Sequence, residues 1–359
     1  MHDPDEEVEL GYVTVPSGTL VITDMGYLGS WSGSRPPSSV PPEITDPDLR
    51  ASVVAAQDFR VVGRDAESAA RAIDLQSLTF LYDIPRHGVA TMLARFKETV
   101  DRHGFDARLE AEHTRVSHRE RARRAAAAGG ADFTVDGVWS VAIGHLPEDR
   151  PLKVVGHKHD YGTGVGERWV DVTVVVAGGL EASARRRVGQ IGVDWARIIL
   201  IDADALGFWV HEDALDGRAD VAYWGRDVDL ARVSLGGDRL EDGTFGWKDQ
   251  PAAEALVIAT RAERWRSDSN RRLMVDYRPH SHHHEVMEQI RRGNEFGVGA
   301  IDIGGARAVA FHTSWGDGVF PVFREGTDRQ VTAVRVVLGD DDRKQRTQAV
   351  LSRRESPRA

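Results

Sequence analysis

The side chains best suited to chemistry gather in one segment, residues 276–285, which reads Asp-Tyr-Arg-Pro-His-Ser-His-His-His-Glu. Four imidazoles beside two carboxylates and a guanidinium are typical of a metal site or an acid–base site. Ser281 is a good N-cap, so a helix is predicted to begin directly after it. The positive end of the helix dipole disfavours a charged imidazole, and neutral imidazole is the form that binds metal or accepts a proton.

The predicted helix, residues 282–292, has an apolar stripe at positions 286, 287 and 290. His282 and His283 each lie four residues before a member of this stripe, so both are expected to face inward. His284 lies four residues before Glu288 and is expected on the outer side. The segment therefore predicts His280, His282 and His283 as ligands of a divalent metal, with zinc, manganese and iron left open.

The same histidines have an alternative interpretation, in which they form hydrogen bonds that close the start of the helix. The H-E-x-x-H spacing of zinc proteases is absent from the segment. The two interpretations differ when His282 and His283 are both replaced by alanine. Metal ligation predicts lost metal binding in a folded protein, whereas a closing role predicts unfolding.

Further polar residues near both ends of the chain complete the predicted site. Asp24 ends an apolar run, and His312 and Asp317 flank the sequence Thr-Ser-Trp-Gly. Together with the histidine segment they suggest a metal-dependent hydrolase that acts on a phosphoester or a similar bond. The residues assigned to catalysis are Asp24, Asp276, Arg278, His312 and Asp317.

Three other patterns give weaker signals for a site. His157 and His159 share one face of a predicted strand, which suits two metal ligands. Asp202 and Asp204 follow a very apolar strand, where α/β proteins often place functional carboxylates. The glycine-rich loop at 162–166 is followed by a strand pattern, not by a helix, so no nucleotide cofactor is expected.

Two motifs at the chain ends, Val-Pro-Ser-Gly-Thr-Leu-Val-Ile-Thr-Asp at 15–24 and Trp-Gly-Asp-Gly-Val-Phe-Pro-Val at 315–322, are similar to paired motifs of a bacterial family of uncharacterised proteins. In that family S-G-x-L and an Asp come first, and G-D-G-x-[YF]-P-V follows much later. The stretch 276–283 also resembles a segment of actinobacterial members. The resemblance implies one β-rich domain built from both chain ends, and it carries over no activity. Members usually have Pro after the first Asp, whereas Met25 follows Asp24 here.

The elements predicted around these residues give an α+β fold. Short β-rich runs favour an antiparallel sheet domain formed by residues 1–50 and 270–340. Residues 51–269 are expected as a mixed α/β insertion, with a helix over 87–103, an exposed arginine-rich helix after residue 115, and a strand–helix–strand unit whose helix covers 181–188. Residues 341–359 are basic and polar, which predicts a flexible tail.

The composition excludes several classes of function. The 359 residues contain no cysteine, so disulfides, a thiolate nucleophile and cysteine-bound metals are excluded, and the net charge of −10 argues against general nucleic-acid binding. No apolar stretch reaches the ~20 residues of a membrane span, and the acidic N-terminus lacks signal-peptide features, so a cytoplasmic location is expected. The expected partner is a small-molecule ligand. The alternative is a non-catalytic interaction protein, such as an immunity protein against a basic toxin, and the oligomeric state is open.

Overall fold

The computed structural model describes residues 6–39, 47–73, 75, 78–162, 165–177, 184–292, 297–327, 330–339 and 341–355. The chain divides into two compact units: a larger unit, Met1–Phe208 with Asp302–Ala359, and a smaller unit, Trp209–Ile301. The insertion expected at 51–269 coincides with neither unit. The reason is that strands from residues 131–202 pair with strands from both chain ends, so they belong to the larger unit.

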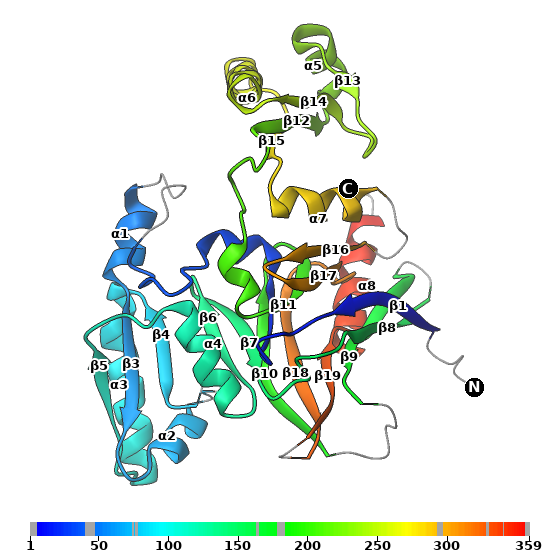
Figure 1. Cartoon of the computed structure of the whole chain (residues 1–359). Coiled ribbons are helices and arrows are strands. Elements are labelled where there is room, and N and C mark those ends of the chain that lie inside the picture. Colours follow the sequence, from blue (N-terminus) through cyan, green and yellow to red (C-terminus); the bar gives the residue numbers. More distant parts are fainter. Residues whose placement is uncertain are drawn as a thin grey trace. The chain divides into compact units, whose positions relative to one another are not determined.

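Two six-stranded sheets dominate the strand content of the chain (Figure 1). The first has the order β1 (Glu6–Val13), β8 (Leu152–Asp160), β9 (Glu167–Val175), β19 (Val331–Val337), β18 (Gly318–Gly326) and β10 (Arg185–Val193). The second has the order β16 (Val298–Ile303), β17 (Ala306–His312), β11 (Arg197–Asp202), β2 (Leu20–Asp24), β7 (Val138–Ile143) and β6 (Ala131–Val135). The strand pairs described for both sheets are antiparallel, which confirms the predicted α+β class.

The two sheets of the larger unit contact each other. Strand β10 contacts β2, β6 and β7, and β1 contacts β17. Apolar side chains from five of these strands are fully buried: Val13, Ile22, Ile191, Phe311 and Phe320. Burial of this many β-branched and aromatic side chains supplies the main driving force for packing, at roughly 1.5–3 kcal/mol for each side chain.

A third sheet of the larger unit has the order β4 (Phe80–Ile84), β3 (Gln57–Val62) and β5 (Arg108–Glu112). Helices α2 (Ala66–Ala72) and α3 (Val89–His103) pack on it around the buried Phe59 and Phe96. Helix α3 confirms the helix predicted over 87–103, and it ends at Gly104, whose φ of 68° suits glycine. The remaining elements of the unit are α1 (Pro47–Ala55), α4 (His118–Ala127), α8 (Asp341–Glu355) and the 3-10 helices η1 (Met25–Ser30), η2 (Arg86–Gly88) and η3 (Ala205–Phe208).

Two local predictions for the larger unit are wrong. Residues 185–188, expected in a helix, lie in strand β10, while 181–183 lie outside the described residues. Residues 185–187 pair with β18, and further along the strand the buried Ile191 and Val193 alternate with the less buried Gln190 and Gly192, which is the period of a sheet, not of a helix. Residues 341–355, expected as a flexible tail, form helix α8. Its acidic start at 341–342 and basic end at 353–354 both favour a helix through its dipole.

The arginine-rich helix α4 is not simply a solvated face. Ser117 caps it by accepting a hydrogen bond from the backbone N–H of Glu120, at 3.3 Å. Arg121, in its second turn, is fully buried and donates to Asp83 at 2.6 Å and to Asp58 at 3.3 Å. Burial raises the pKa of Asp58, whereas hydrogen bonds and charge from Arg121 outweigh burial at Asp83 and lower the pKa of its carboxyl. The arginine thus joins α4 to the third sheet through β3 and β4.

His118, at the start of α4, makes the stability of the larger unit depend on pH. Its Nδ1 accepts a hydrogen bond from the backbone N–H of Ser32 at 2.9 Å, and burial, assisted by Arg121, lowers the pKa of its imidazole to about 3. The unfolded chain binds a proton at His118 from about pH 6.5 downward, while the folded protein stays neutral there. Stability should therefore fall by about 1.4 kcal/mol for each pH unit between pH 6.5 and 3 on account of this one residue.

Urea unfolding of wild type and of His118→Asn over this pH range measures the contribution. An Asn side chain can still accept the hydrogen bond from the backbone N–H of Ser32, but it does not titrate. The slope of unfolding free energy against pH should therefore be smaller in the variant by the contribution of one proton, about 1.4 kcal/mol for each pH unit. Equal slopes for the two proteins would show that His118 is not held neutral in the folded state.

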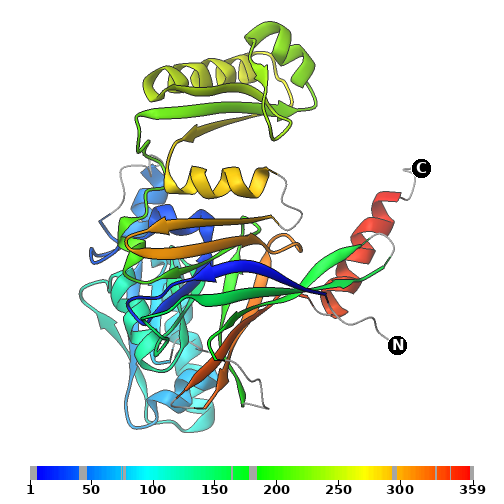
Figure 2. The same cartoon turned by 45° about the vertical axis from the view of Figure 1, so that its right-hand side comes forward.

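The smaller unit is a four-stranded antiparallel sheet with helices on both faces. The strand order is β13 (Asp238–Arg239), β14 (Phe245–Pro251), β12 (Arg218–Gly225) and β15 (Leu273–Pro279). Helices α5 (Val228–Leu235) and α6 (Ala252–Asp268) pack on the face that carries Val221 and Tyr223. Helix α7 (His282–Arg291) lies on the other face (Figures 1 and 2). Because side chains alternate along β12, Asp220 points toward the α7 side.

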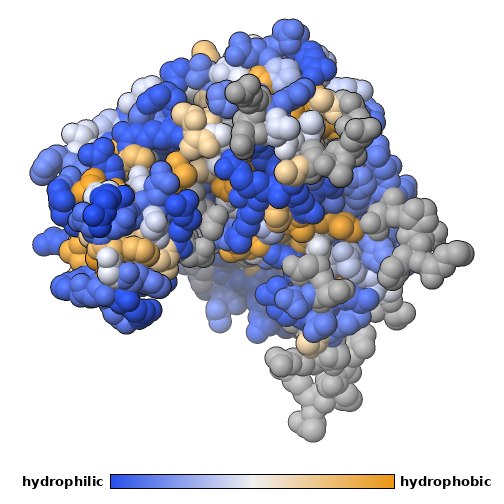
Figure 3. Space-filling view, turned by 90° about the horizontal axis from the view of Figure 1, so that it is seen from below, coloured by the Kyte–Doolittle hydropathy of each residue, from blue (hydrophilic) through white to orange (hydrophobic). Residues whose placement is uncertain are grey.

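The surface carries the high charge content of the sequence. In the view of Figure 3, hydrophilic residues cover most of the visible face and hydrophobic residues form separate small patches. Within the part of the chain that the structure describes, no helix combines the length and the apolar character that a membrane crossing requires.

Candidate metal centre

Helix α7 begins where the sequence predicts. Ser281 accepts a hydrogen bond from the backbone N–H of His284 at 3.2 Å, which caps the helix as expected. Val286, Met287 and Ile290 are buried, which confirms the predicted inward stripe. The expectation that His284 faces outward is wrong, since it is only 8% exposed.

Three residues of the smaller unit form a group that could hold a metal ion: Asp220, His280 and His284. Three separate segments supply them. Asp220 lies in β12, His280 directly follows β15, and His284 lies in the first turn of α7. The pairing of β12 with β15 sets His280 next to β12, since its backbone N–H donates to Arg218 O at 3.0 Å. One ligand-capable atom from each residue lies within 4.8 Å of the other two.

The distances within this group suit shared ligation. His280 Nε2 lies 3.2 Å from Asp220 Oδ1, and His284 Nε2 lies 3.9 Å from Asp220 Oδ2. Two ligands that each lie ~2.1 Å from a tetrahedral ion are ~3.4 Å apart, which falls between these values. The two imidazole rings stack at a centroid distance of 4.8 Å, with 19° between their planes.

The partners of His280 orient its ring. Its Nδ1 lies 2.9 Å from Asp216 Oδ2, so Nε2 is turned toward Asp220. A carboxylate that accepts from the far nitrogen is the arrangement that fixes the tautomer of metal-binding histidines. Burial lowers the pKa of His280, but the hydrogen bonds that its ring donates to Asp216 and Asp220 outweigh burial, and the net shift is upward. A cation is thus favoured beside Asp220, and a metal ion would take the place of the proton on Nε2.

His284 is held in the other protonation state. Burial lowers the pKa of its imidazole despite the nearby charge of Asp220. Its Nδ1 is buried and accepts or donates no hydrogen bond among the described residues. A buried, neutral imidazole with an unpartnered nitrogen is costly, by about 1–3 kcal/mol, while its other nitrogen, Nε2, lies on the side of Asp220 and is available to a metal ion.

The group lies at the wall of an open pocket of about 460 Å³ in the smaller unit. Its lining residues include Asp216, Asp220, Lys248, Asp249, His280, Ser281, His284, Glu285, Glu288 and Arg292. A smaller hollow of about 30 Å³ adjoins it, and both share Asp220, Lys248, His284, Glu288 and Arg292. A ligand in the larger hollow would therefore meet the two imidazoles and charged groups of both signs.

The predicted ligands His282 and His283 lie outside this group. His282 Nδ1 accepts a hydrogen bond from the backbone N–H of Val210 at 2.9 Å, and its ring lies near Trp209. His283 packs on His211 at a ring-centroid distance of 4.1 Å, and burial lowers the pKa of His211 to about 4. Of the three histidines assigned to a metal, the structure brings only His280 into the group.

The predicted Asp276 and Arg278 lie on β15 in the same unit. Arg278 Nε donates to Asp276 at 2.7 Å, and Arg278 Nη1 donates to Asp242 at 2.9 Å. Arg291 of α7 adds an ion pair to Asp276 at 3.4 Å. Arg278 lines the smaller hollow, so these residues border the metal group without belonging to it.

The remaining predicted catalytic residues belong to the larger unit, where the two aspartates hold a turn. The buried Asp24 accepts hydrogen bonds from the backbone N–H groups of Asp194 and Trp195, at 2.7 and 2.9 Å. Asp317 accepts from the N–H of Ala196 at 3.1 Å. The two end motifs therefore meet at residues 194–196. His312 is half-buried in β17, and burial lowers its pKa.

The weaker sequence signals also have structural partners in the larger unit. His157 Nδ1 lies 2.8 Å from Asp171 Oδ1, while His159 contacts the edge of Tyr161. Asp202 accepts hydrogen bonds from both the N–H and the hydroxyl of Ser17, at 2.8 and 2.6 Å. The contact of His157 with Asp171 joins β8 to β9, and that of Asp202 with Ser17 joins segments far apart in sequence.

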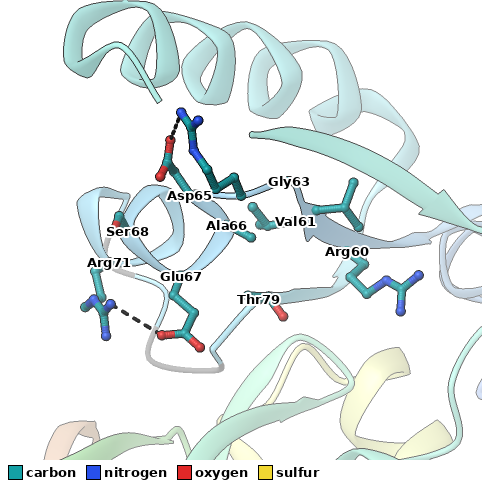
Figure 4. Close-up of a pocket in the computed structure, with 11 residues that line it drawn as sticks. Arg60, Val61, Gly63, Asp65, Ala66, Glu67, Ser68, Arg71 and Thr79 are labelled. Atoms are coloured by element: carbon teal, nitrogen blue, oxygen red, sulfur yellow. Dashed lines mark hydrogen bonds and ion pairs between the residues drawn. The ribbon is translucent and has the colours of Figure 1, made fainter. Parts of the chain in front are cut away.

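The larger unit has an open pocket of its own, of about 610 Å³, beside α2 (Figure 4). Three arginines line it, and each has a carboxylate near it. Arg60 lies 4.0 Å from Glu112, and the ion pairs Arg64–Asp65 and Arg71–Glu67 measure 3.4 and 3.5 Å. Exposed pairs of this kind contribute little to binding or stability, and no functional site is assigned to this pocket.

Sequence analysis missed Asp220, Asp216 and the role of His284 in this group. One signal was available, because His284-Glu285-Val-Met-Glu288 has the spacing of H-E-x-x-H with Glu in the last position. That spacing places His284 and Glu288 on one helix face, and both line the pocket. Asp220 carries no local signal, since only the pairing of β12 with β15 brings it to the histidines.

Comparison of the chain with family models, with curated proteins and with solved structures gave no match. The resemblance of the chain ends to a bacterial family therefore stays a prediction.

Proposed function

We propose that the chain is a metal-dependent hydrolase whose divalent ion is held by Asp220, His280 and His284. The observation that carries the proposal is the position of this group at the wall of an open pocket whose lining residues are mostly charged. Two imidazoles and one carboxylate suit zinc, manganese or iron, and three protein ligands leave a coordination position for water. A divalent ion bound there would supply a water whose pKa is lowered toward neutrality.

Glu288 is proposed as the general base. It follows His284 by one helical turn and lines both hollows that His284 lines. Burial raises the pKa of its carboxyl, but Lys248 and Arg292 outweigh burial and lower it, so the carboxylate is ionised at neutral pH. In the proposed reaction Glu288 takes a proton from the attacking water and passes it to the leaving group as the bond to that group breaks.

Lys248 and Arg292 are proposed to offset the charge that develops in the transition state. Both reach Glu288, at 3.4 and 3.1 Å, and both line the pocket. Attack of water on a carboxylic acid derivative places negative charge on the carbonyl oxygen, and neighbouring cations stabilise that charge.

Hydrolysis by zinc-loaded protein tests this proposal. On a panel of chromogenic esters, amides and phosphoesters, zinc-loaded protein should act on at least one substrate, and chelation should remove the activity. Glu288→Gln should lower kcat by about 10²–10⁴-fold, the usual contribution of a general base, while zinc affinity stays within about threefold.

A matched control for this variant is Glu254→Gln, which changes an exposed glutamate in the first turn of α6 and should leave kcat unchanged. Zinc-loaded protein without activity on the panel would contradict the hydrolase. Full activity of Glu288→Gln would exclude Glu288 as the base.

A further inference from the structure

The charge of the pocket restricts the substrate. The residues that line the two adjoining hollows include seven carboxylates and four cationic side chains. The carboxylates are Asp216, Asp220, Glu241, Asp242, Asp249, Glu285 and Glu288, and the cations are Lys248, Arg278, Arg291 and Arg292. Metal ligation requires neutral imidazoles, so the side chains of the lining then sum to three negative charges, which the bound divalent ion reduces to one. An anionic substrate would meet a field of its own sign.

The four cations already have carboxylate partners. Lys248 and Arg292 each lie within 4.0 Å of both Glu241 and Glu288, which forms a closed ring of two cations and two anions. Arg278 pairs with Asp242 and Asp276, and Arg291 pairs with Asp276. A phosphate group at these cations would lie beside their carboxylate partners, and repulsion between the like charges would cancel part of its attraction to the cations.

Glu285 differs from the other carboxylates of the pocket. It is exposed in the first turn of α7, and its carboxylate forms no hydrogen bond or ion pair with any residue that the structure describes. The neighbouring His282 is engaged elsewhere, since its Nδ1 accepts a hydrogen bond from the backbone N–H of Val210. His284, next to Glu285 in the sequence, is buried, lines the same pocket and has an unpartnered Nδ1, which points to a ligand at this position independently of the acidic residues.

We propose that the substrate of this site is a carboxylic acid derivative that carries a protonated amine, and that Glu285 binds the amine. This inference rests on the proposed hydrolase. Water adds to the carbonyl carbon, Glu288 takes the water proton, and the bond from the carbonyl carbon to the leaving nitrogen or oxygen breaks as that atom receives the proton. The amine takes no part in the bond changes, and its pairing with Glu285 orients the substrate.

Three hydroxamates of one chain length test the inference on zinc-loaded, tag-free protein. Hydroxamates bind metal ions that have an open position. β-Alanine hydroxamate carries an amine, propionohydroxamate carries no charge, and succinic monohydroxamate carries a carboxylate. Calorimetric titration at pH 7 and low salt measures the three Kd values. The amine compound should bind most tightly and the neutral compound less tightly. The carboxylate compound should bind at least about tenfold more weakly than the amine compound.

In Glu285→Gln, the Kd of propionohydroxamate divided by the Kd of β-alanine hydroxamate should be about fivefold smaller than in wild type. The Kd of propionohydroxamate itself should not change. Glu254→Gln, on a different helix, should change none of the three values. A carboxylate compound that binds as tightly as the amine, or an unchanged ratio in Glu285→Gln, would overturn the inference while the hydrolase stands. If propionohydroxamate does not bind zinc-loaded protein, the metal has no open coordination position, and this result would contradict the proposed hydrolase itself.

Discussion

Replacing His284 with alanine should weaken zinc binding by about 10²-fold or more, because it leaves two of three protein ligands. Asp220→Asn should have an effect of similar size. Its amide oxygen still accepts the hydrogen bond that the backbone N–H of Asp249 donates to Asp220 at 2.7 Å, but its charge is lost. Calorimetric titration with zinc measures both affinities, and thermal unfolding shows whether each variant is folded.

The matched control for this prediction is His282→Asn. His282 Nδ1 accepts a hydrogen bond from the backbone N–H of Val210, and the side-chain oxygen of Asn can accept the same bond. Zinc affinity should therefore be unchanged in this variant, in contrast to the sequence-based hypothesis that His282 and His283 are ligands. Equal loss of affinity in His282→Asn and His284→Ala would contradict the assigned group.

Arg121→Met should lower the free energy of unfolding of the protein by about 3–5 kcal/mol. Arg121 is fully buried and compensates the charges of Asp58 and Asp83, which are themselves buried. Methionine fills part of the volume but leaves two carboxylates without this cation in a low-dielectric environment. The midpoint of urea unfolding at pH 7, with its slope, measures the loss.

Arg123→Met is the control on the same helix. Arg123 is 69% exposed in its side chain and pairs with Glu120 near the surface, so its replacement should change stability by no more than about 0.5 kcal/mol. A loss below about 1 kcal/mol in Arg121→Met would show that other groups compensate the two aspartates.

Local sequence signals predicted the elements that depend on neighbouring residues. Ser281 caps α7 and Gly104 ends α3 because capping involves only three or four residues along the chain. The α+β class followed from short β-rich runs at both ends. The prediction of a helix over 181–188 is wrong for residues 185–188. A short run with several arginines fits the period of a helix as well as that of a strand, and pairing with β18 makes it a strand.

The composition of the candidate site depends on distant residues that no local pattern identifies. Asp220 reaches His280 through the register of β12 with β15, and a shift by one residue would turn its side chain to the other face. Arg121 finds partners at Asp58 and Asp83, far away in sequence, so its burial could not be predicted from a helix rich in arginine. Asp24 and Asp317 were chosen for their type, and the structure shows both accepting backbone hydrogen bonds from one turn.

Anomalous diffraction at the zinc edge, from crystals of tag-free protein grown with one equivalent of zinc, locates the metal ion itself. We expect one strong peak in the smaller unit, ~2.0–2.2 Å from Asp220, His280 and His284. A peak ligated instead by His282 and His283, or no peak at the three residues in zinc-containing crystals, would contradict the assigned group.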